Sequence, residues 1–188
     1  MKKSYSSNLC IALVHYPVVN KNGDVIASAV TNLDLHDISR LAKTYGVSPF
    51  YVVTPLKDQR ALVEKIVSHW TRGTGARYNP MRQEALELIR IRESLAEVAD
   101  HIRNNGEEPE IVVTSARDYP QSISHARFRE MLTSGKKYVL SFGTAWGLSE
   151  DMISEAHHVL DPIKGNADYN HLSVRSAVSI MLDRLIEV

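Results

Sequence analysis

A short stretch near position 35 gathers residue types that can orient an anion and move a proton. It contains Asp34, His36, Asp37 and Arg40. The two aspartates are three residues apart and His36 and Arg40 are four apart, so in a helix the members of each pair are neighbours. Carboxylates and imidazoles are suitable general bases, and a guanidinium orients anions. We therefore predict a cluster that positions a nucleophile and takes its proton; the alternative is a solvated helix start whose acids complement the helix dipole.

A glycine-flanked loop follows an apolar run later in the chain. The sequence Gly143-Thr-Ala-Trp-Gly147 comes directly after the run Tyr138–Phe142. Glycines allow backbone N–H groups to approach a ligand closely, and Trp146 can cover a flat ring. The loop matches neither a Walker A sequence nor a GxGxxG fingerprint. It indicates a ligand site, with an ordinary strand-to-helix turn as the alternative.

Arginines and aromatic residues are interleaved in a third stretch. They are Arg72, Arg77 and Arg82, together with Trp70 and Tyr78. Basic and stacking side chains in alternation are typical of surfaces that bind RNA. The alternative is a flexible surface loop with scattered arginines.

Composition limits the other kinds of chemistry. The 22 basic and 22 acidic residues balance, which excludes binding of nucleic acid through global charge alone but permits a local basic patch. His157 and His158 are adjacent, so on a helix end they point apart, and no cysteine or carboxylate cluster accompanies them; we predict no metal site. The single cysteine, Cys10, lies in an apolar run and is expected to be a buried, inert thiol.

The elements that position these residues alternate between strand and helix. This order is typical of a parallel sheet with crossover helices, so we predict an α/β fold with about five parallel strands. The expected strands are Leu9–His15, Phe50–Thr54, Ile111–Thr114, Tyr138–Phe142 and Val159–Leu160. The expected helices are Asp34–Tyr45, Asp58–Trp70, Glu84–Arg103, Ser124–Leu132, Ser149–His157 and Leu172–Ile186, with a long loop at Thr71–Pro80.

The length of 188 residues fits one domain, which we expect to span residues 1–188. The start Met1-Lys2-Lys3 followed by Leu9–Val14 imitates a signal peptide only weakly, because the apolar run is short and is broken by His15. No run reaches the ~20 apolar residues that a membrane span requires. We expect a cytoplasmic protein that contacts no membrane.

Three blocks of the sequence, read in order, resemble the motifs of the SPOUT methyltransferases. Asp34-Leu-His-Asp-Ile-Ser-Arg40, ending in Gly46-Val47, resembles the first motif, with Asp34 at the position of an asparagine. Ser141-Phe-Gly-Thr-Ala-Trp-Gly-Leu-Ser149 resembles the second, and Leu160-Asp-Pro-Ile163 with Tyr169-Asn-His-Leu-Ser-Val174 the third. The departures, among them the missing glutamate of the second motif, argue against 2′-O-methylation of ribose.

A small group of stand-alone bacterial α/β-knot proteins is more similar still. Its members share HYP, TNLDxHDI, GxxxRYNPxRxEAL, FGTxWGL and DxNHLSVR, which cover essentially the whole chain here. The resemblance implies a C-terminal trefoil knot, a homodimer, an RNA substrate (tRNA or rRNA) and S-adenosylmethionine as cofactor. It places the cofactor at Gly143, Thr144, Trp146, Gly147, Asp161, Ile163, Asn170, His171 and Leu172.

The predicted reaction is methyl transfer to an RNA nucleoside. The nucleophile must be placed in line with the methyl carbon and must lose its proton. We expect Arg40 to orient the acceptor and Asp34, Asp37 or, as a weaker candidate, Asp168 to be the base, which favours a ring nitrogen over a ribose hydroxyl. RNA would be bound by Arg72, Arg77, Tyr78 and Arg82. The alternatives are a non-catalytic RNA- or cofactor-binding module and a small-molecule methyltransferase.

Overall fold

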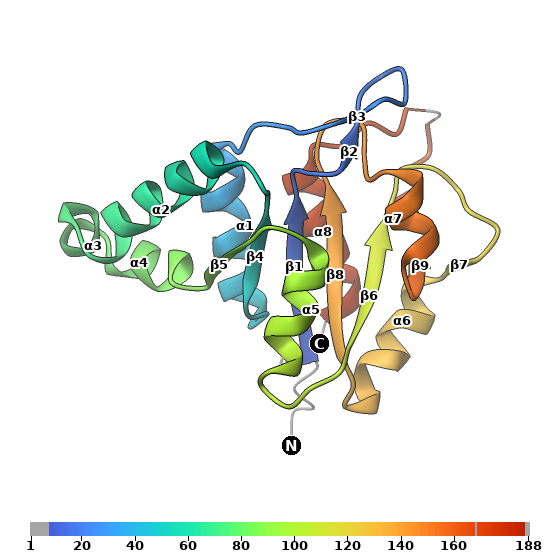
Figure 1. The fold of residues 1–188 in the computed structure, drawn as a ribbon. Helices are drawn as coiled ribbons and strands as arrows, with labels where there is room; N and C mark the ends of the chain where they lie inside the picture. Colours follow the sequence, from blue (N-terminus) through green and yellow to red (C-terminus); the bar gives the residue numbers. More distant parts are fainter. Residues whose placement is uncertain (1–7, 168, 187–188) are drawn as a thin grey trace.

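A computed structural model describes residues 8–167 and 169–186. Its main feature is a seven-stranded sheet in which all paired strands are parallel, in the order β5-β4-β1-β8-β6-β9-β7 (Figure 1). The strands are β1 (Leu9–Val14), β4 (Phe50–Val53), β5 (Ile89–Arg92), β6 (Pro109–Thr114), β7 (Ser122–Ile123), β8 (Lys137–Gly143) and β9 (His158–Leu160). A two-stranded antiparallel ribbon, β2 (Val18–Val19) with β3 (Val25–Ile26), lies beyond the end of β1.

Strand β1 lies in the interior of the sheet, between β4 and β8. All six residues of β1 are fully buried, as expected for a strand covered on both faces. The register pairs Val14 with Gly143 on β8 and with Val53 on β4, so the carboxyl ends of the three strands are level. The loops that leave these ends are therefore brought together at one edge.

Helices cover both faces of the sheet. Alternate residues of β1 point to opposite sides: Leu9, Ile11 and Leu13 pack with α1 and α8, whereas Cys10, Ala12 and Val14 pack with α5 and α7. Figure 1 shows α5 in front of the sheet and α8 behind it. The helices are α1 (Asn32–Tyr45), α2 (Lys57–Thr71), α3 (Thr74–Tyr78), α4 (Pro80–Leu86), α5 (Leu95–Arg103), α6 (His125–Met131), α7 (Glu150–Glu155) and α8 (Val174–Ile186), with a 3₁₀ turn, η2, at Leu132–Ser134.

The boundaries of α1 follow from its capping residues. Thr31 adopts an extended conformation and its side chain accepts a hydrogen bond from the Asp34 N–H. Gly46 ends the helix with a positive φ of 70° and donates to carbonyls of the last turn. The predicted helix Asp34–Tyr45 is confirmed, with its start two residues earlier than predicted.

The predicted single helix Glu84–Arg103 is wrong. The chain there forms the end of α4, then strand β5, then α5. The sequence Ile89-Arg-Ile-Arg92 alternates apolar and basic residues and extends the sheet beside β4, with Ile89 opposite Phe50. A new helix starts at Ser94, whose side chain accepts from the Glu97 N–H at 3.2 Å. The apolar residues of this region recur at helical spacing, so the alternation of apolar and basic residues in the short edge strand was not recognised.

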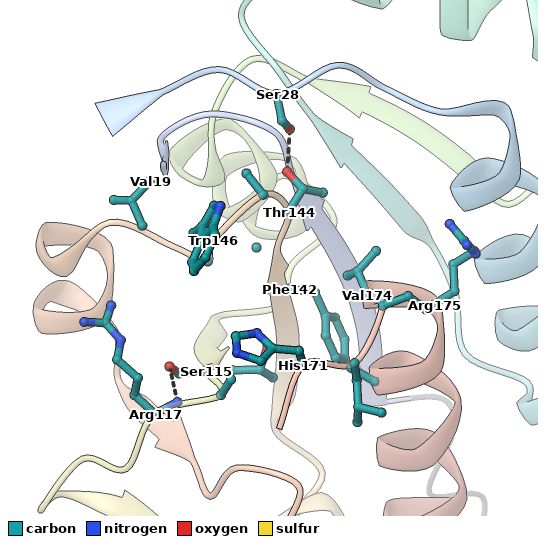
Figure 2. Close-up of a pocket in the computed structure, with 18 of the residues that line it drawn as sticks. Val19, Ser28, Ser115, Arg117, Phe142, Thr144, Trp146, His171, Val174 and Arg175 are labelled. Atoms are coloured by element: carbon teal, nitrogen blue, oxygen red, sulfur yellow. Dashed lines mark hydrogen bonds between the residues drawn. The ribbon is translucent and has the colours of Figure 1, made fainter. Parts of the chain in front are cut away.

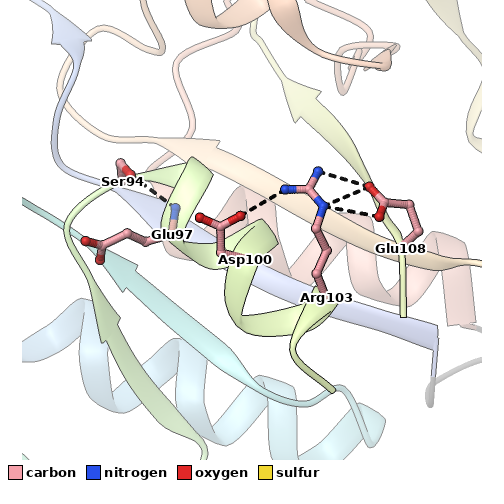
Figure 3. Close-up of polar contacts among 5 residues, drawn as sticks. All are labelled: Ser94, Glu97, Asp100, Arg103 and Glu108. Atoms are coloured by element: carbon pink, nitrogen blue, oxygen red, sulfur yellow. Dashed lines mark hydrogen bonds and ion pairs between the residues drawn. The ribbon is translucent and has the colours of Figure 1, made fainter. Parts of the chain in front are cut away.

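The end of α5 is connected to β6 by a small charged cluster. Arg103 pairs with Asp100 at 3.0 Å and with Glu108 at 2.9 Å (Figure 3). All three side chains are about half exposed or more, so solvent weakens these contacts and each contributes little to stability. The cluster helps to end the helix and has no connection with the carboxyl edge of the sheet.

Other predictions need smaller corrections. The segment Thr71–Pro80, predicted as a loop, contains α3, and the last helix starts at Val174 instead of Leu172. Helices α2, α3 and α4 form a lobe that projects from the sheet (Figure 1). The sheet gains β5 and β7, which the five-strand prediction lacked. Within residues 8–167 and 169–186 no helix is long and apolar enough to cross a membrane.

Candidate functional site

A cavity of about 730 Å³ opens at the carboxyl edge of the sheet, where the ends of β1, β6, β8 and β9 meet. Open parallel sheets bind ligands in this position because the loops that leave the strands converge there. Four segments form most of the walls: the loop after β8, the loop after β6, the segment that leads into α8 and the segment from β2 to the start of α1 (Figure 2). The volume is in the range of small-molecule and cofactor sites.

The loop Gly143–Gly147 is held tightly by backbone contacts. A Cβ on Gly143 would lie 2.5 Å from the Leu148 nitrogen, so only glycine fits there. The loop is joined to β2, where the Trp146 N–H donates to the Val19 carbonyl at 3.1 Å and the Val19 N–H donates to the Gly147 carbonyl at 2.9 Å. The loop therefore has a fixed shape, and it leaves the Trp146 side chain 61% exposed.

A buried hydrogen-bond chain attaches this loop to the end of β1. The Thr144 hydroxyl donates to the Val14 carbonyl at 3.0 Å, so the contact between Ser28 and Thr144 requires Ser28 to donate (Figure 2). Ser28 then accepts from Nδ1 of His15 at 2.9 Å, which leaves the fully buried Nε2 as a bare acceptor without a partner among the described residues. Burial lowers the pKa of His15 to about 4, opposed by the nearby Asp34. His15 is thus neutral at physiological pH, and sequence reasoning had not assigned it a role.

An ion pair joins the starts of α1 and α8 at the rim of the cavity. Arg175 Nη1 lies 2.6 Å from Oδ1 of Asp34, whose side chain is only 7% exposed, and the Thr31 hydroxyl donates to Oδ2 at 2.6 Å. Arg175 Nε also contacts Asp37 at 3.3 Å. Both oxygens of Asp34 therefore have partners. The prediction for Asp34 had missed Arg175, although the residue is visible as a basic side chain in the first turn of an otherwise apolar helix face.

A second, more open cavity of about 480 Å³ adjoins the first. Asp37 and Arg40 line it, as do Ser173 and Arg175, which belong to both cavities. The predicted catalytic residues are thus divided, with Asp34 in the first cavity and the other two in the second. Asp168, the weaker candidate base, lies outside the described residues.

Most of the predicted cofactor residues are found together in the first cavity. The residues that line it are Gly143, Thr144, Trp146, Gly147, Ile163, Asn170, His171 and Leu172. Asp161 is not in its lining, and its N–H donates to the Ile123 carbonyl of β7. Sequence reasoning missed the loop after β6, from which Thr114, Ser115 and Arg117 contribute to the walls.

The predicted RNA-binding residues are on the lobe, away from both cavities. Arg72, Arg77 and Tyr78 are exposed. Arg82 instead turns inward: its guanidinium carbon lies 4.6 Å from the centre of the Trp70 ring. The structure thus gives Arg82 a packing contact inside the lobe, and its role in RNA binding stays a prediction.

No group of His, Cys, Asp and Glu side chains that could hold a metal ion occurs within the described ranges. Burial raises the pKa of the Cys10 thiol to about 12, the direction expected for an inert, buried thiol.

A family model described as "SAM-dependent RNA methyltransferase" matches residues 8–187. The chain belongs to this family of S-adenosylmethionine-dependent RNA methyltransferases. The match covers almost the whole sequence, so the predicted enzyme class and cofactor are confirmed.

This methyltransferase matches two relatives, nearly the whole of one and less than half of the other. An "Uncharacterized protein" of Aquifex aeolicus (strain VF5) is 38% identical over 182 residues, which are 96% of this chain and 89% of the relative. A "tRNA (guanine-N(1)-)-methyltransferase" of Nitratidesulfovibrio vulgaris (strain Hildenborough) is 44% identical over 180 residues, which are 95% of this chain. The chain spans only 42% of that second relative, so most of the named enzyme lies outside the match.

The fold of the methyltransferase is also found in solved structures. It resembles the A. aeolicus TrmH/SpoU tRNA modifying enzyme with a TM-score of 0.57 and 16% sequence identity, over 97% of this chain and 77% of that one. At this identity the likeness concerns the fold alone. The predicted α/β fold with a parallel sheet is confirmed.

The residues of the first cavity fit S-adenosylmethionine. Gly147 has a φ of 111° and a Cβ built on it meets nothing within 4 Å, so its backbone faces open space that a ligand can enter. Buried apolar side chains, Phe142, Ile163 and Met181, line the interior and suit a flat ring. The hydroxyls of Thr114 and Ser115 are suitable partners for polar groups of the cofactor.

Proposed function

We propose that the first cavity binds S-adenosylmethionine and that a nucleoside of tRNA or rRNA is methylated on a ring nitrogen at its rim. The observation that carries this proposal is the cavity itself, bounded by the glycine loop after β8 and the segment before α8, with the Asp34–Arg175 pair at its edge. The cofactor supplies an electrophilic methyl group on a sulfonium, so the chain's own residues need only orient the acceptor and remove a proton.

Among the predicted bases, Asp37 suits proton removal best. Both oxygens of Asp34 are held by Arg175 and Thr31, which leaves Asp34 to position Arg175. Asp37 is 44% exposed and shares Arg175 at the longer distance of 3.3 Å, so one of its oxygens can face an incoming substrate. We propose Asp37 as the base and Arg40, beside it in the second cavity, as the residue that orients the acceptor.

A ring nitrogen is the acceptor that this arrangement supports best. A carboxylate can receive the proton of a purine or pyrimidine ring N–H more readily than that of a ribose hydroxyl, because the closer match of acidity lowers the cost of the transfer. The relative named as a guanine-N1 methyltransferase carries such an activity in its name, though this chain corresponds to less than half of it.

The resemblance to knotted SPOUT enzymes extends the proposal to topology and assembly. We propose a single domain with a C-terminal trefoil knot, acting as a homodimer. Two contacts between the segment before α8 and the loop after β6 support the threading: the Asn170 amide donates to the Ala116 carbonyl at 3.0 Å, and Lys164 pairs with Asp118 at 2.7 Å. Sedimentation equilibrium tests the assembly; twice the chain mass of 21.1 kDa is expected, and the single mass would contradict it.

Nucleoside mass spectrometry tests the reaction. RNA from cells that lack the protein is incubated with purified enzyme and methyl-labelled S-adenosylmethionine, then digested to nucleosides. We expect one labelled nucleoside methylated on its base, and we expect Asp37→Asn to slow its formation at unchanged cofactor affinity. A label on the ribose would overturn the ring-nitrogen assignment, and unlabelled RNA would favour the non-catalytic alternative.

A further inference from the structure

The mouth of the first cavity carries exposed rings. Trp146, from the loop after β8, and His171, from the segment before α8, both line the cavity, with ring centres 6.2 Å apart. Tyr169 makes an edge contact with His171, with the two ring centres 5.4 Å apart. Trp146 is 61% and Tyr169 75% exposed. Isolated exposed apolar residues are common on proteins, but rings from two separate loops in mutual contact beside a cavity call for a partner.

Two cations line the same cavity as these rings. Lys21, from the turn between β2 and β3, and Arg117, from the loop after β6, both line the cavity and are exposed. Arg117 pairs with Glu150 at 2.8 Å, but both side chains are about 60% exposed, so this pair is weak and Arg117 can exchange it for another anion. Aromatic rings with cations in the same cavity suit an unpaired nucleotide, because the base can stack while the phosphates meet the positive charges.

The position of the rings separates them from the expected place of the cofactor. Phe142, Ile163 and Met181 form a buried interior that can enclose a cofactor, whereas Trp146 and His171 stand at the exposed opening. Figure 2 shows Arg117 and Arg175 on opposite sides of the cavity, with the two rings between them. Asp37 and Arg40 line the second cavity, whereas Trp146 and His171 line only the first, which suits a nucleotide next to the methylated one.

We propose that Trp146 and His171, with Lys21 and Arg117, form a stacking subsite for an unpaired nucleotide of the substrate RNA that flanks the acceptor. This inference rests on the proposed function and adds to it that the substrate is single-stranded at the modified site, as in a loop. It also assigns Trp146 and His171 to RNA in place of the cofactor, to which the family resemblance had assigned them.

Binding measurements on matched variants test the subsite. A fluorescein-labelled 12-nucleotide single-stranded RNA and its duplex are titrated by anisotropy, and S-adenosylmethionine by calorimetry. Trp146→Ala should weaken binding of the single strand by about 5- to 100-fold, the loss expected for one stacked base. Trp146→Phe should retain most of the affinity, and Leu62→Ala, an exposed apolar residue on α2, should leave it unchanged. Duplex binding and cofactor affinity should change less than about 2-fold in Trp146→Ala.

Two outcomes separate the subsite from the proposed function. If Trp146→Ala lost cofactor affinity but kept its affinity for the single strand, the ring would belong to the cofactor and the inference would be overturned. The subsite would also be overturned if Trp146→Ala bound the single strand as tightly as the wild type does. Methylation of RNA by the wild type would in that case leave the methyltransferase proposal intact. Failure of the wild type to bind S-adenosylmethionine would instead overturn the proposed function.

Discussion

The ion pair between Asp34 and Arg175 gives the sharpest prediction about stability. Arg175→Ala would leave the Asp34 carboxylate buried, with only the Thr31 hydroxyl and the start of α1 to compensate its charge. Removing one partner of a buried pair costs about 3–5 kcal/mol. Because Arg175 is 32% exposed, water can enter after truncation, so we expect a smaller loss, about 2–3 kcal/mol.

Urea unfolding at pH 7 measures this loss. At a slope of about 2 kcal/mol per molar urea, the midpoint should fall by about 1–1.5 M. Arg175→Lys keeps the charge but has a single ammonium, which cannot reproduce the two contacts to Asp34 and Asp37, so its loss should be intermediate. Asp34→Asn added to Arg175→Ala should restore part of the stability, because it removes the uncompensated charge.

The reasoning would be refuted by a loss below about 0.5 kcal/mol in Arg175→Ala, or by strictly additive effects in the double variant. Either result would mean that the pair is solvated in solution and that α1 and α8 are joined by apolar packing alone.

Three further predictions concern other contacts of the site and the lobe. The pKa of His15 is about 4 in the folded protein and about 6.5 in the unfolded chain, so as pH falls the unfolded chain binds a proton first. Roughly 3 kcal/mol of stability should therefore be lost between pH 6.5 and pH 4. His15→Asn should flatten this pH dependence, as measured by urea titrations at a series of pH values. Gly143→Ala places a Cβ 2.5 Å from a backbone nitrogen, so it should lower the free energy of unfolding by about 1–3 kcal/mol and weaken cofactor binding measured by calorimetry. Gly165→Ala, whose Cβ meets nothing within 4 Å, should change neither quantity. Arg82→Ala should lower the free energy of unfolding by about 0.5–2 kcal/mol, and with it the melting temperature, because it loosens the lobe. The exposed Arg77→Ala should leave the melting temperature unchanged, and equal values for the two variants would show that the stacked arginine contributes nothing.

The sequence predicts the elements whose signals are local. Helix α1 was located to within two residues because its apolar positions recur regularly and Gly46 marks its end. Strand β5 was missed because Leu88 and Ile91 fit the three- to four-residue spacing that continues at Leu95, and only the neighbouring β4 makes the extended conformation favourable. Edge strands of four residues carry too few positions for their period to be recognised.

The loops that form the site could be predicted from the sequence, but the contacts between distant side chains could not. The glycine loop and the segment before α8 were both identified, and they do meet in one cavity. Arg175 is 141 residues from Asp34, and Thr144 is 116 from Ser28, so neither contact leaves a signal in the sequence nearby. The same holds for Arg117, whose loop reaches the cavity only because β6 lies beside β8.

Hydrogen exchange in the presence of S-adenosylhomocysteine, the product that the cofactor becomes, tests whether the cavity at the carboxyl edge of the sheet is the cofactor site. Amide exchange is compared with and without saturating S-adenosylhomocysteine. We expect protection in residues 142–148, 161–167 and 169–173, with little change in the lobe formed by α2, α3 and α4. Protection confined to the lobe, or none despite binding, would contradict it.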